Sequence, residues 1–421
     1  MENIVHDKQK IVILAWATFP FGSASASRLR TFSKGLLENG VSVRLITTSR
    51  ILYRDVDYKE DSGLAWHGIH YECTNGYHVP GKKYSLLSRT FKLARAIYRS
   101  WARLYRLIAQ GECTAVYIYG RSILSYGPAA LIARCTGVPV LYDICEWFPA
   151  DKFRWGWLNP TFIDDYCGRQ LPRFLGNGVV AITSHIKEKY DEMLVPCILI
   201  PSLCDSNHQQ PQGVARRRRS VDEIFTMVYA GTCKPGDGFE NLLSAVKKVV
   251  ADGHLVRLHV VGTDGLSGLA ASHRSTSEED PLLRDCVRFL GRVSDEQYPI
   301  VLQDADCLVL PRPDNKIVRA AFPTRLPEFL SSGRPVLTTN VPDVPRYLIA
   351  GVHAEIVDGT DDSALAQGIV RLMGNPDRAE KIGLAGKQRC REVFDYRPYM
   401  AELAALIFPD RKFKIKSQTT I

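Results

Sequence analysis

The chain reads FTMVYAGTCKPGDGFENL from Phe225 to Leu242. The run from Phe225 to Tyr229 is short and apolar, which predicts a buried strand. The glycines that follow predict a loop, and the apolar spacing from Asn241 to Val250 predicts a helix. A strand, a glycine-rich loop and a helix in this order form the first part of a β-α-β unit, from which parallel α/β folds are built.

The same alternation extends outward from this stretch in both directions. Further apolar runs that we interpret as strands are Ile11–Ala15, Val41–Thr47, Val116–Tyr119, Val138–Tyr142, Val179–Ile182, Ile198–Ile200, Val256–Val261, Val287–Leu290, Cys307–Leu310 and Pro335–Thr338. Continuous apolar runs of this kind are typical of parallel strands that are buried on both faces. A helical pattern over Ser27–Glu38 separates the first two of them. We therefore predict two doubly wound α/β domains.

The boundaries follow from a change in composition. After Pro201 the chain becomes polar and shows no apolar period before Ile224. We expect an N-terminal domain over 1–204, a linker over 205–223, a C-terminal domain over 224–393, and a final helix and tail over 394–421. Four consecutive arginines, 216–219, lie among Gln, Pro, Gly and Ser in this linker, and this setting favours a solvated segment over a nucleic-acid site.

Composition excludes several classes of protein. The 421 residues contain eleven cysteines without any C-x-x-C pair, which argues against a zinc site or a disulfide scaffold and indicates a reducing cytoplasm. No run is long enough for a signal sequence or a membrane span. The net charge of +9 indicates an anionic partner, namely a phosphate-bearing ligand or a lipid surface. We expect no nucleic-acid partner, since no motif for one is present.

One segment departs from the globular pattern. Residues 82–110 contain eight Lys or Arg and no acidic residue. Apolar residues spaced by three and four predict a helix with one apolar stripe, made of Leu87, Phe91, Ala94, Tyr98, Trp101, Tyr105 and Ile108. Such a basic amphipathic helix suits an anionic membrane surface. The alternative is that the stripe packs on a sheet, and the sequence does not choose between the two.

The turn after the first strand carries small residues, including Gly22, and lacks G-x-G-x-x-G. A hydride-transfer cofactor is therefore not expected, and we predict no cofactor. Small residues at a strand-to-helix turn let a ligand approach the backbone, and helix-end amides favour negative charge. The alternative is a tight turn without a ligand.

Two segments of the second domain have the chemistry to hold a diphosphate. The loop with Gly231, Thr232 and Lys234 can surround phosphates with amides while the lysine offsets their charge. Further on, Arg325 can bind a diphosphate, and Glu328 can accept a hydrogen bond from a ribose hydroxyl. Thr324 and Glu328 could instead form a helix-capping pair.

Together these motifs resemble the family 4 retaining glycosyltransferases of the GT-B fold. The resemblance spans nearly the whole chain and rests mainly on Tyr229-Ala230-Gly231, Phe289-Leu290-Gly291-Arg292-Val293, and Phe322-Pro323-Thr324-Arg325-Leu326-Pro327-Glu328 ending in Gly333-Arg334-Pro335-Val336. Leu141-Tyr142-Asp143-Ile144-Cys145-Glu146-Trp147 resembles a subgroup associated with bacterial surface polysaccharides.

This resemblance implies two facing Rossmann-like domains and a C-terminal helix that crosses back onto the first. It implies that the second domain binds a nucleotide-sugar donor, with Lys234 and Arg325 on the diphosphate, Glu328 on the ribose and the backbone from Gly291 to Val293 on the base. The expected donor contacts are Gly22, Gly231, Thr232, Lys234, Arg292, Thr324, Arg325, Leu326 and Glu328. The expected activity is transfer of a hexose-type sugar, with retention, to a lipid-linked or polysaccharide acceptor at the inner face of a bacterial membrane.

The sequence departs from the family at two places. The first glutamate of its paired-glutamate motif is replaced by Ala320, and a histidine of the first domain is absent near Asp143. Asp143 and Glu146 are then the nearest polar candidates for a catalytic role, together with Arg325. Because of these departures, a catalytically silent nucleotide-sugar-binding partner stays open as an alternative, as does a sugar-nucleotide 2-epimerase.

Asp304-Ala305-Asp306 has the form of a metal-binding D-x-D motif, but it directly precedes a buried strand. Carboxylates at such a boundary commonly accept hydrogen bonds from backbone amides. We therefore expect a structural role for these acids and no metal site.

Overall fold

The structure is a computed structural model that describes residues 9–20, 24–49, 64–76, 85–206, 223–234, 236–263, 268–294, 296–359 and 361–408. The chain folds into two compact units. The first comprises Met1–Pro201 with Tyr396–Thr420, and the second is essentially Ser202–Asp395. Gly22 and the arginine run 216–219 lie outside the described residues.

The described part of the first unit contains an eight-stranded sheet. Its strands in spatial order are β3 (Leu64–Trp66), β4 (Ile69–Cys73), β2 (Ser42–Thr47), β1 (Lys10–Ala15), β5 (Ala115–Tyr119), β6 (Val140–Ile144), β7 (Gly178–Ala181) and β8 (Cys197–Leu199). All neighbours are parallel except β3 and β4. The central strand β1 is almost completely buried, as a parallel strand covered on both faces must be.

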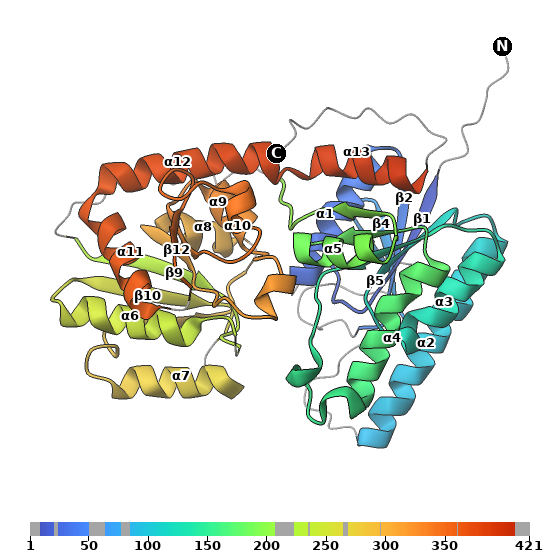
Figure 1. Ribbon diagram of the computed structural model, residues 1–421, viewed down its shortest axis with the longest axis horizontal. Coiled ribbons are helices and arrows are strands. Elements are labelled where there is room, and N and C mark those ends of the chain that lie inside the picture. Colours follow the sequence, from blue (N-terminus) through green and yellow to red (C-terminus); the bar gives the residue numbers. More distant parts are fainter. Residues whose placement is uncertain are drawn as a thin grey trace, which may run out of the picture. The chain divides into compact units, whose positions relative to one another are not determined.

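Helices connect these strands (Figure 1). They are α1 (Ala24–Glu38), α2 (Leu86–Ala109), α3 (Ile123–Cys135), α4 (Pro160–Leu175) and α5 (Ser184–Glu192), with short 3₁₀ turns η1 (Ala150–Lys152) and η2 (Gly156–Leu158). The chain returns to this unit at its end, where α13 (Tyr396–Ile407) packs on α1. Gly35 allows this close packing, because a Cβ there would lie 2.2 Å from a side-chain carbon of Met400.

The second unit repeats the architecture with a six-stranded parallel sheet in its described residues. The spatial order is β11 (Val287–Gly291), β10 (Val256–Val261), β9 (Phe225–Ala230), β12 (Cys307–Leu310), β13 (Val336–Thr339) and β14 (Glu355–Val357). Its helices are α6 (Phe239–Ala251), α7 (Gly268–Glu279), α8 (Gln297–Asp304), η3 (Val318–Ala320), α9 (Leu326–Ser332), α10 (Val344–Tyr347), α11 (Asp362–Gly374) and α12 (Pro376–Val393). The predicted fold class, two doubly wound parallel sheets, is confirmed.

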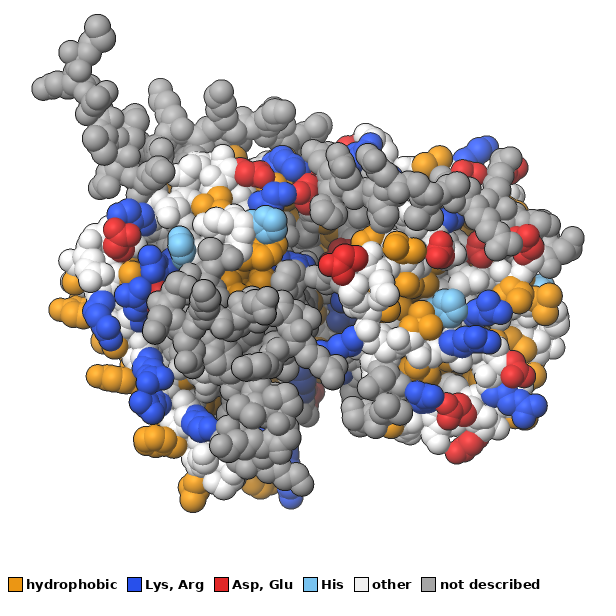
Figure 2. Space-filling model, turned by 180° about the vertical axis from the view of Figure 1, so that it is seen from behind, with side chains coloured by type: hydrophobic (Ala, Val, Ile, Leu, Met, Phe, Trp, Pro, Cys, Tyr) orange, Lys and Arg blue, Asp and Glu red, His pale blue; other side chains and the backbone are white. Residues whose placement is uncertain are grey.

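The apolar stripe predicted for residues 82–110 does not pack on a sheet. Helix α2 forms, but its buried side chains are Ala96, Ser100, Leu104 and Leu107. Most of the predicted stripe is exposed, including Leu87 at 84% and Phe91 at 70%. Figure 2 shows hydrophobic and basic side chains alternating along the edge of the first unit that carries this helix. In the described residues, no helix combines the length and apolar character needed to cross a membrane.

Candidate functional site

The second sheet has a topological switch point at β9 and β12. The chain runs from β9 outward to β10 and β11, and from β12 outward to β13 and β14 on the other side. In open α/β sheets, ligands bind outside the carboxyl ends of the strands at such a point. Gly231, Thr232 and Lys234 follow β9, and Thr324, Arg325 and Glu328 lie between β12 and β13. Both predicted segments therefore lie in connections that start at the carboxyl ends of these two strands.

The loop after β9 touches the chain after β12. Gly238 has a positive φ of 77°, and a Cβ there would lie 1.5 Å from the carbonyl oxygen of Pro311. Only glycine fits this position. The contact brings the glycine-rich loop and the end of β12 together at the switch point.

A hollow of about 110 Å³ lies beside this contact, lined by Lys234, Gly236, Gly238, Phe239, Glu240, Asn241, His273 and Pro313. The first turn of α6 forms one wall, and its N-cap residue Gly238 has no side chain to satisfy the first amides of the helix. Unpaired N–H groups at a helix start attract anions. Together with the exposed side chain of Lys234, these amides can attract an anion, while the carboxylate of Glu240 also lines the hollow.

Arg325 and Glu328 form an ion pair in which Nη1 of Arg325 donates to Oε2 of Glu328 at 2.7 Å. The carboxylate raises the pKa of the guanidinium, so Arg325 is permanently charged. The guanidinium also lies 5.2 Å from the ring centre of Tyr298. Arg325 keeps 39% of its side chain exposed, so it remains accessible to a ligand.

The alternative of a capping pair is not observed. Arg325, and not Thr324, is the N-cap of α9, and no side chain accepts a capping hydrogen bond there. The carboxylate of Glu328 instead holds Arg325. Leu326 is completely buried and its N–H donates to the carbonyl of Pro323, which leaves it little to offer a ligand.

Arg292 follows β11 and is exposed. Backbone groups link the strand ends there, since Gly231 N–H donates to Val261 and Gly262 N–H donates to Gly291, each at 2.9 Å. Sequence reasoning missed Gly262 and His273. A signal for the first existed, because Gly262 directly follows an apolar strand, as Gly231 does.

Asp306 has the structural role predicted for it. Its Oδ2 accepts the N–H of Thr226 at 2.8 Å, which joins the starts of β12 and β9. Among the described residues, no cluster of His, Cys, Asp and Glu could hold a metal ion.

In the first unit, Asp143 is buried at the end of β6. Arg28 donates from Nε to Oδ2 at 2.8 Å and from Nη2 to Oδ1 at 2.9 Å. Burial opposes the charge on Arg28, but Asp143 outweighs it and the pKa of the guanidinium is raised. Both carboxylate oxygens are thus engaged, and the side chain is only 1% exposed.

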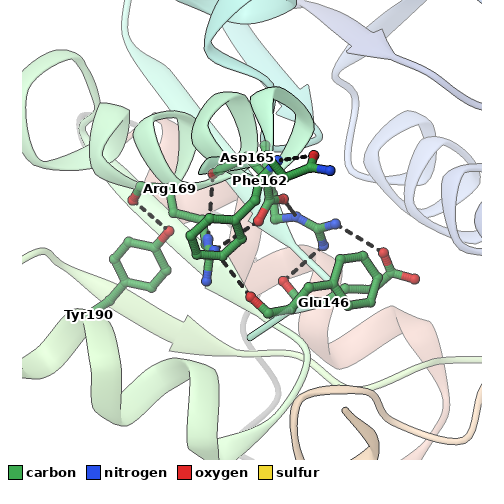
Figure 3. A network of polar contacts seen from close by, with 8 residues as sticks. Glu146, Phe162, Asp165, Arg169 and Tyr190 are labelled. Atoms are coloured by element: carbon green, nitrogen blue, oxygen red, sulfur yellow. Dashed lines mark hydrogen bonds and ion pairs between the residues drawn. The ribbon is translucent and has the colours of Figure 1, made fainter. Parts of the chain in front are cut away.

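Glu146 is more accessible and belongs to a polar network at the carboxyl ends of β5 and β6 (Figure 3). Arg121 donates to Oε2 of Glu146 at 3.1 Å and to Oδ1 of Asp165 at 2.6 Å. Arg169 pairs with the other oxygen of Asp165 at 2.9 Å. The side chain of Glu146 is 51% exposed, so the network presents one carboxylate to solvent.

Helix α4 approaches this network closely because of Gly168. A Cβ at that position would lie 1.4 Å from the carbonyl oxygen of Arg121. The close approach places Asp165 and Arg169 of α4 beside Arg121. Nothing in the sequence pattern pointed to these three residues.

The geometry of the second unit agrees with the comparison with protein families. Residues 215–389 match the family described as Glycosyl transferases group 1. The matched residues contain the glycine-rich loop, the hollow and the Arg325–Glu328 pair.

A curated relative is also a glycosyltransferase. A capsular polysaccharide biosynthesis glycosyltransferase, CapM of Staphylococcus aureus, is 26% identical over 190 residues, which cover 44% of this chain and 46% of CapM. The match thus spans about half the length of that relative.

Solved structures extend the similarity of fold to both units. Sucrose-phosphate synthase from Thermosynechococcus elongatus has a TM-score of 0.69 at 18% identity, covering 96% of this chain and 100% of its own. HepE from Anabaena, solved with UDP and glucose, has a TM-score of 0.68 at 15% identity, covering 94% and 99%. At these identities the likeness shows the fold, which is the GT-B fold of glycosyltransferases.

Proposed function

We propose that this protein transfers a hexose-type sugar from a nucleoside-diphosphate sugar to a lipid-linked or polysaccharide acceptor in bacterial surface polysaccharide biosynthesis. The observation that carries the proposal is the hollow at the switch point of the group 1 domain, where Lys234 and the uncapped start of α6 meet. The similarity to CapM supports the polysaccharide context. HepE, solved with UDP and glucose, supports a nucleoside-diphosphate donor.

In this proposal the diphosphate of the donor meets three positive features. These are the amides of α6, Lys234 and the guanidinium of Arg325. Positive groups fixed in advance stabilise the charge that develops on a leaving diphosphate, and this electrostatic contribution is commonly the largest in catalysis. No metal is required for it. Glu328 holds Arg325 and accepts a hydrogen bond from a ribose hydroxyl. The remaining donor contacts are Gly231, Thr232, Thr324 and Arg292.

On the acceptor side, we assign contact with the acceptor hydroxyl to Glu146, which is half-exposed and held by Arg121. Asp143 becomes a positioning residue, because Arg28 engages both of its oxygens. Retention of anomeric configuration is proposed from the family resemblance. We also propose that the segment 82–110 contacts an anionic membrane at its cytoplasmic face, where a lipid-linked acceptor would lie.

A transfer assay tests the activity. Purified protein is incubated with a radiolabelled nucleotide sugar and a lipid extract from an organism that makes surface polysaccharide. We expect label to enter the organic phase, with release of one nucleoside diphosphate per sugar transferred. A Glu146→Gln variant should lower the rate at saturating donor while leaving donor affinity unchanged.

The two alternatives give different results in the same assay. Donor binding without release of nucleoside diphosphate under any condition would support a silent binding partner. Conversion of the donor into another nucleotide sugar without an acceptor would support a 2-epimerase. Either outcome would contradict the proposed transfer.

A further inference from the structure

Three helices of the first unit, α2, α3 and α4, form one layer in which α2 packs on α3 and α3 packs on α4 (Figure 1). Helices α3 and α4 also contact the strands β5 and β6. Their exposed side chains therefore point away from the sheet. The exposed large apolar residues of this layer are Leu87, Phe91, Tyr98, Tyr105, Leu124, Leu131, Ile163, Tyr166 and Phe174.

The exposed charged side chains on the described residues of these three helices all have one sign. No exposed side chain of α2, α3 or α4 in the described residues is acidic. The exposed basic ones are Arg89, Arg95, Arg99, Arg106, Arg134 and Arg173. The two aspartates of α4 are engaged, because Asp164 accepts the N–H of Leu124 and Asp165 pairs with Arg121 and Arg169.

The turn before α4, which we call the tryptophan turn, continues this surface with Trp155, Trp157 and Leu158, which are 68%, 63% and 80% exposed. It is attached to the layer, since the ring of Trp157 lies edge-on against Phe162 and Tyr166 of α4 at 4.9 and 5.2 Å. Tryptophan is enriched where proteins meet the headgroup region of a membrane. We call the exposed apolar and basic residues of α2, α3, α4 and this turn the docking face.

The docking face is rigidly supported. Arg103 of α2 forms three hydrogen bonds of 2.8 to 3.1 Å to Glu72 of β4. The indole of Trp101 donates to the carbonyl of Ser125 in α3 at 2.8 Å. These bonds hold α2 with its apolar residues Leu87, Phe91 and Tyr98 outward, so their exposure follows from the packing of the helix.

We propose that the whole docking face, and not the α2 segment alone, lies on an anionic lipid bilayer, with the tryptophan turn inserted at headgroup depth. Aromatic and aliphatic side chains interleaved with arginines, with no exposed acid on the described residues of the three helices, match a surface that is both apolar and anionic. A protein partner of ordinary composition would offer basic groups that these arginines repel. The inference rests on the proposed function where it takes the acceptor to be membrane-bound.

The docking face and the proposed acceptor contact lie at the same edge of the first sheet. Helices α3 and α4 follow β5 and β6, so their first turns lie at the carboxyl edge of the sheet, and α2, which leads into β5, has its first turn there as well. Leu87, Leu124 and the tryptophan turn therefore gather at one edge. Arg121 and Glu146 lie at the same edge. A bilayer in contact with this end would bring a lipid-linked sugar to Glu146.

Co-sedimentation with vesicles tests the proposal. The full-length protein is mixed with phosphatidylcholine vesicles that contain either no phosphatidylglycerol or 30 mol% of it. We expect binding to the anionic vesicles only, weakening as salt rises. Removing two arginines with Arg95→Gln and Arg99→Gln should lower the partition coefficient onto the anionic vesicles about twenty-fivefold, since each basic group contributes roughly a factor of five near such a surface.

The apolar part is tested separately. Leu158→Ser with Phe91→Ser should weaken binding to the anionic vesicles about tenfold or more. Leu255→Ser is the matched control, because Leu255 is 63% exposed on the second unit. Each variant is first checked for an unchanged melting temperature and unchanged nucleoside-diphosphate binding, so a failure of membrane docking is distinguishable from a failure of the proposed transferase function.

Three results would overturn the inference. The first is the absence of binding to anionic vesicles by the wild-type protein. The second is binding that survives both sets of face variants. The third is a stable dimer in solution that the same variants convert to monomer, which would assign the docking face to a second copy of the chain.

Discussion

Arg325 is the residue on which the donor proposal depends most. It lies at the start of α9, keeps its charge through Glu328 and is partly exposed. We predict that Arg325→Ala weakens nucleoside-diphosphate binding by tenfold or more, since a charge-assisted contact contributes about 1.5 to 3 kcal/mol. Isothermal titration measures this directly.

The control is Arg284→Ala. Arg284 is also an exposed arginine paired with an acid, but it precedes β11 and so lies at the opposite, amino end of the sheet. Its removal should leave nucleotide affinity unchanged. Equal affinities for the two variants would contradict the placement of the diphosphate at Arg325.

Asp143 shows how a residue predicted to be catalytic can be engaged elsewhere. Asp143→Asn leaves the guanidinium of Arg28 buried without its full counter-charge, so we predict a loss of roughly 3 kcal/mol in the free energy of unfolding. Urea denaturation measures it. Glu146→Gln, a change at a half-exposed carboxylate, should cost much less stability. An Asp143→Asn protein of unchanged stability and no activity would restore the catalytic assignment.

At the scale of elements, the glycine-rich loop before α6 depends on two glycines with different surroundings. Gly236 and Gly238 both have positive φ, but a Cβ at Gly236 meets nothing within 4 Å, whereas one at Gly238 meets the backbone of Pro311. Gly236→Ala should therefore cost only the strain of the left-handed conformation, about 1 kcal/mol. Gly238→Ala should cost more and also weaken nucleotide binding.

Thermal denaturation and titration of both variants check this prediction. The two glycines lie two residues apart in one loop, so each serves as the control for the other. Equal losses of stability in the two variants would show that the contact with Pro311 does not constrain the loop.

Helix α2 is held to the sheet by Glu72, which pairs with Arg44 and Arg103. Burial opposes ionisation of Glu72, but the hydrogen bonds of the two arginines outweigh it and lower the pKa of the carboxyl. A lowered pKa means that the stabilisation is present above the ordinary pKa of glutamate and is lost as pH falls through the folded-state value.

We therefore predict that Glu72→Gln lowers stability by about 1 to 2 kcal/mol at pH 7, and that the difference from wild type vanishes in acid. Melting curves from pH 7 down to the acid limit of the fold measure it. The control is Glu112→Gln, which removes a carboxyl of an exposed pair with Lys10. A constant difference between Glu72→Gln and wild type at all pH values would contradict the assignment.

Strands were the elements best predicted from the sequence. The apolar runs of the central strands match the structure to within two residues, because burial on both faces leaves an uninterrupted apolar signal. Strands β3, β4 and β14 were missed, because β3 and β14 are edge strands of three residues and β4 is only partly apolar. For α2, spacing predicted the helix but not which stripe would face the core, because both sides of the helix carry apolar residues.

At the scale of the whole molecule, the sequence located the loops that carry the site but not the contacts that complete it. Lys234 and Arg325 stood in recognisable motifs. Arg121, Asp165 and His273 did not. Arg121 meets Asp165 only through the packing of α4 on the loop after β5, and in the second unit His273 reaches the hollow only because α7 lies beside α6. Contacts between residues far apart in the chain leave no periodic signal.

The central claim is that this chain binds a nucleoside-diphosphate sugar, and a thermal-shift screen tests it most directly. The purified protein is heated with UDP, GDP, CMP, NAD and common nucleotide sugars at about 100 times the dissociation constant, where binding stabilises by roughly 2.7 kcal/mol. We predict a raised melting temperature with one nucleoside diphosphate and its sugars. No rise with any of them, or a rise with NAD alone, would contradict the account.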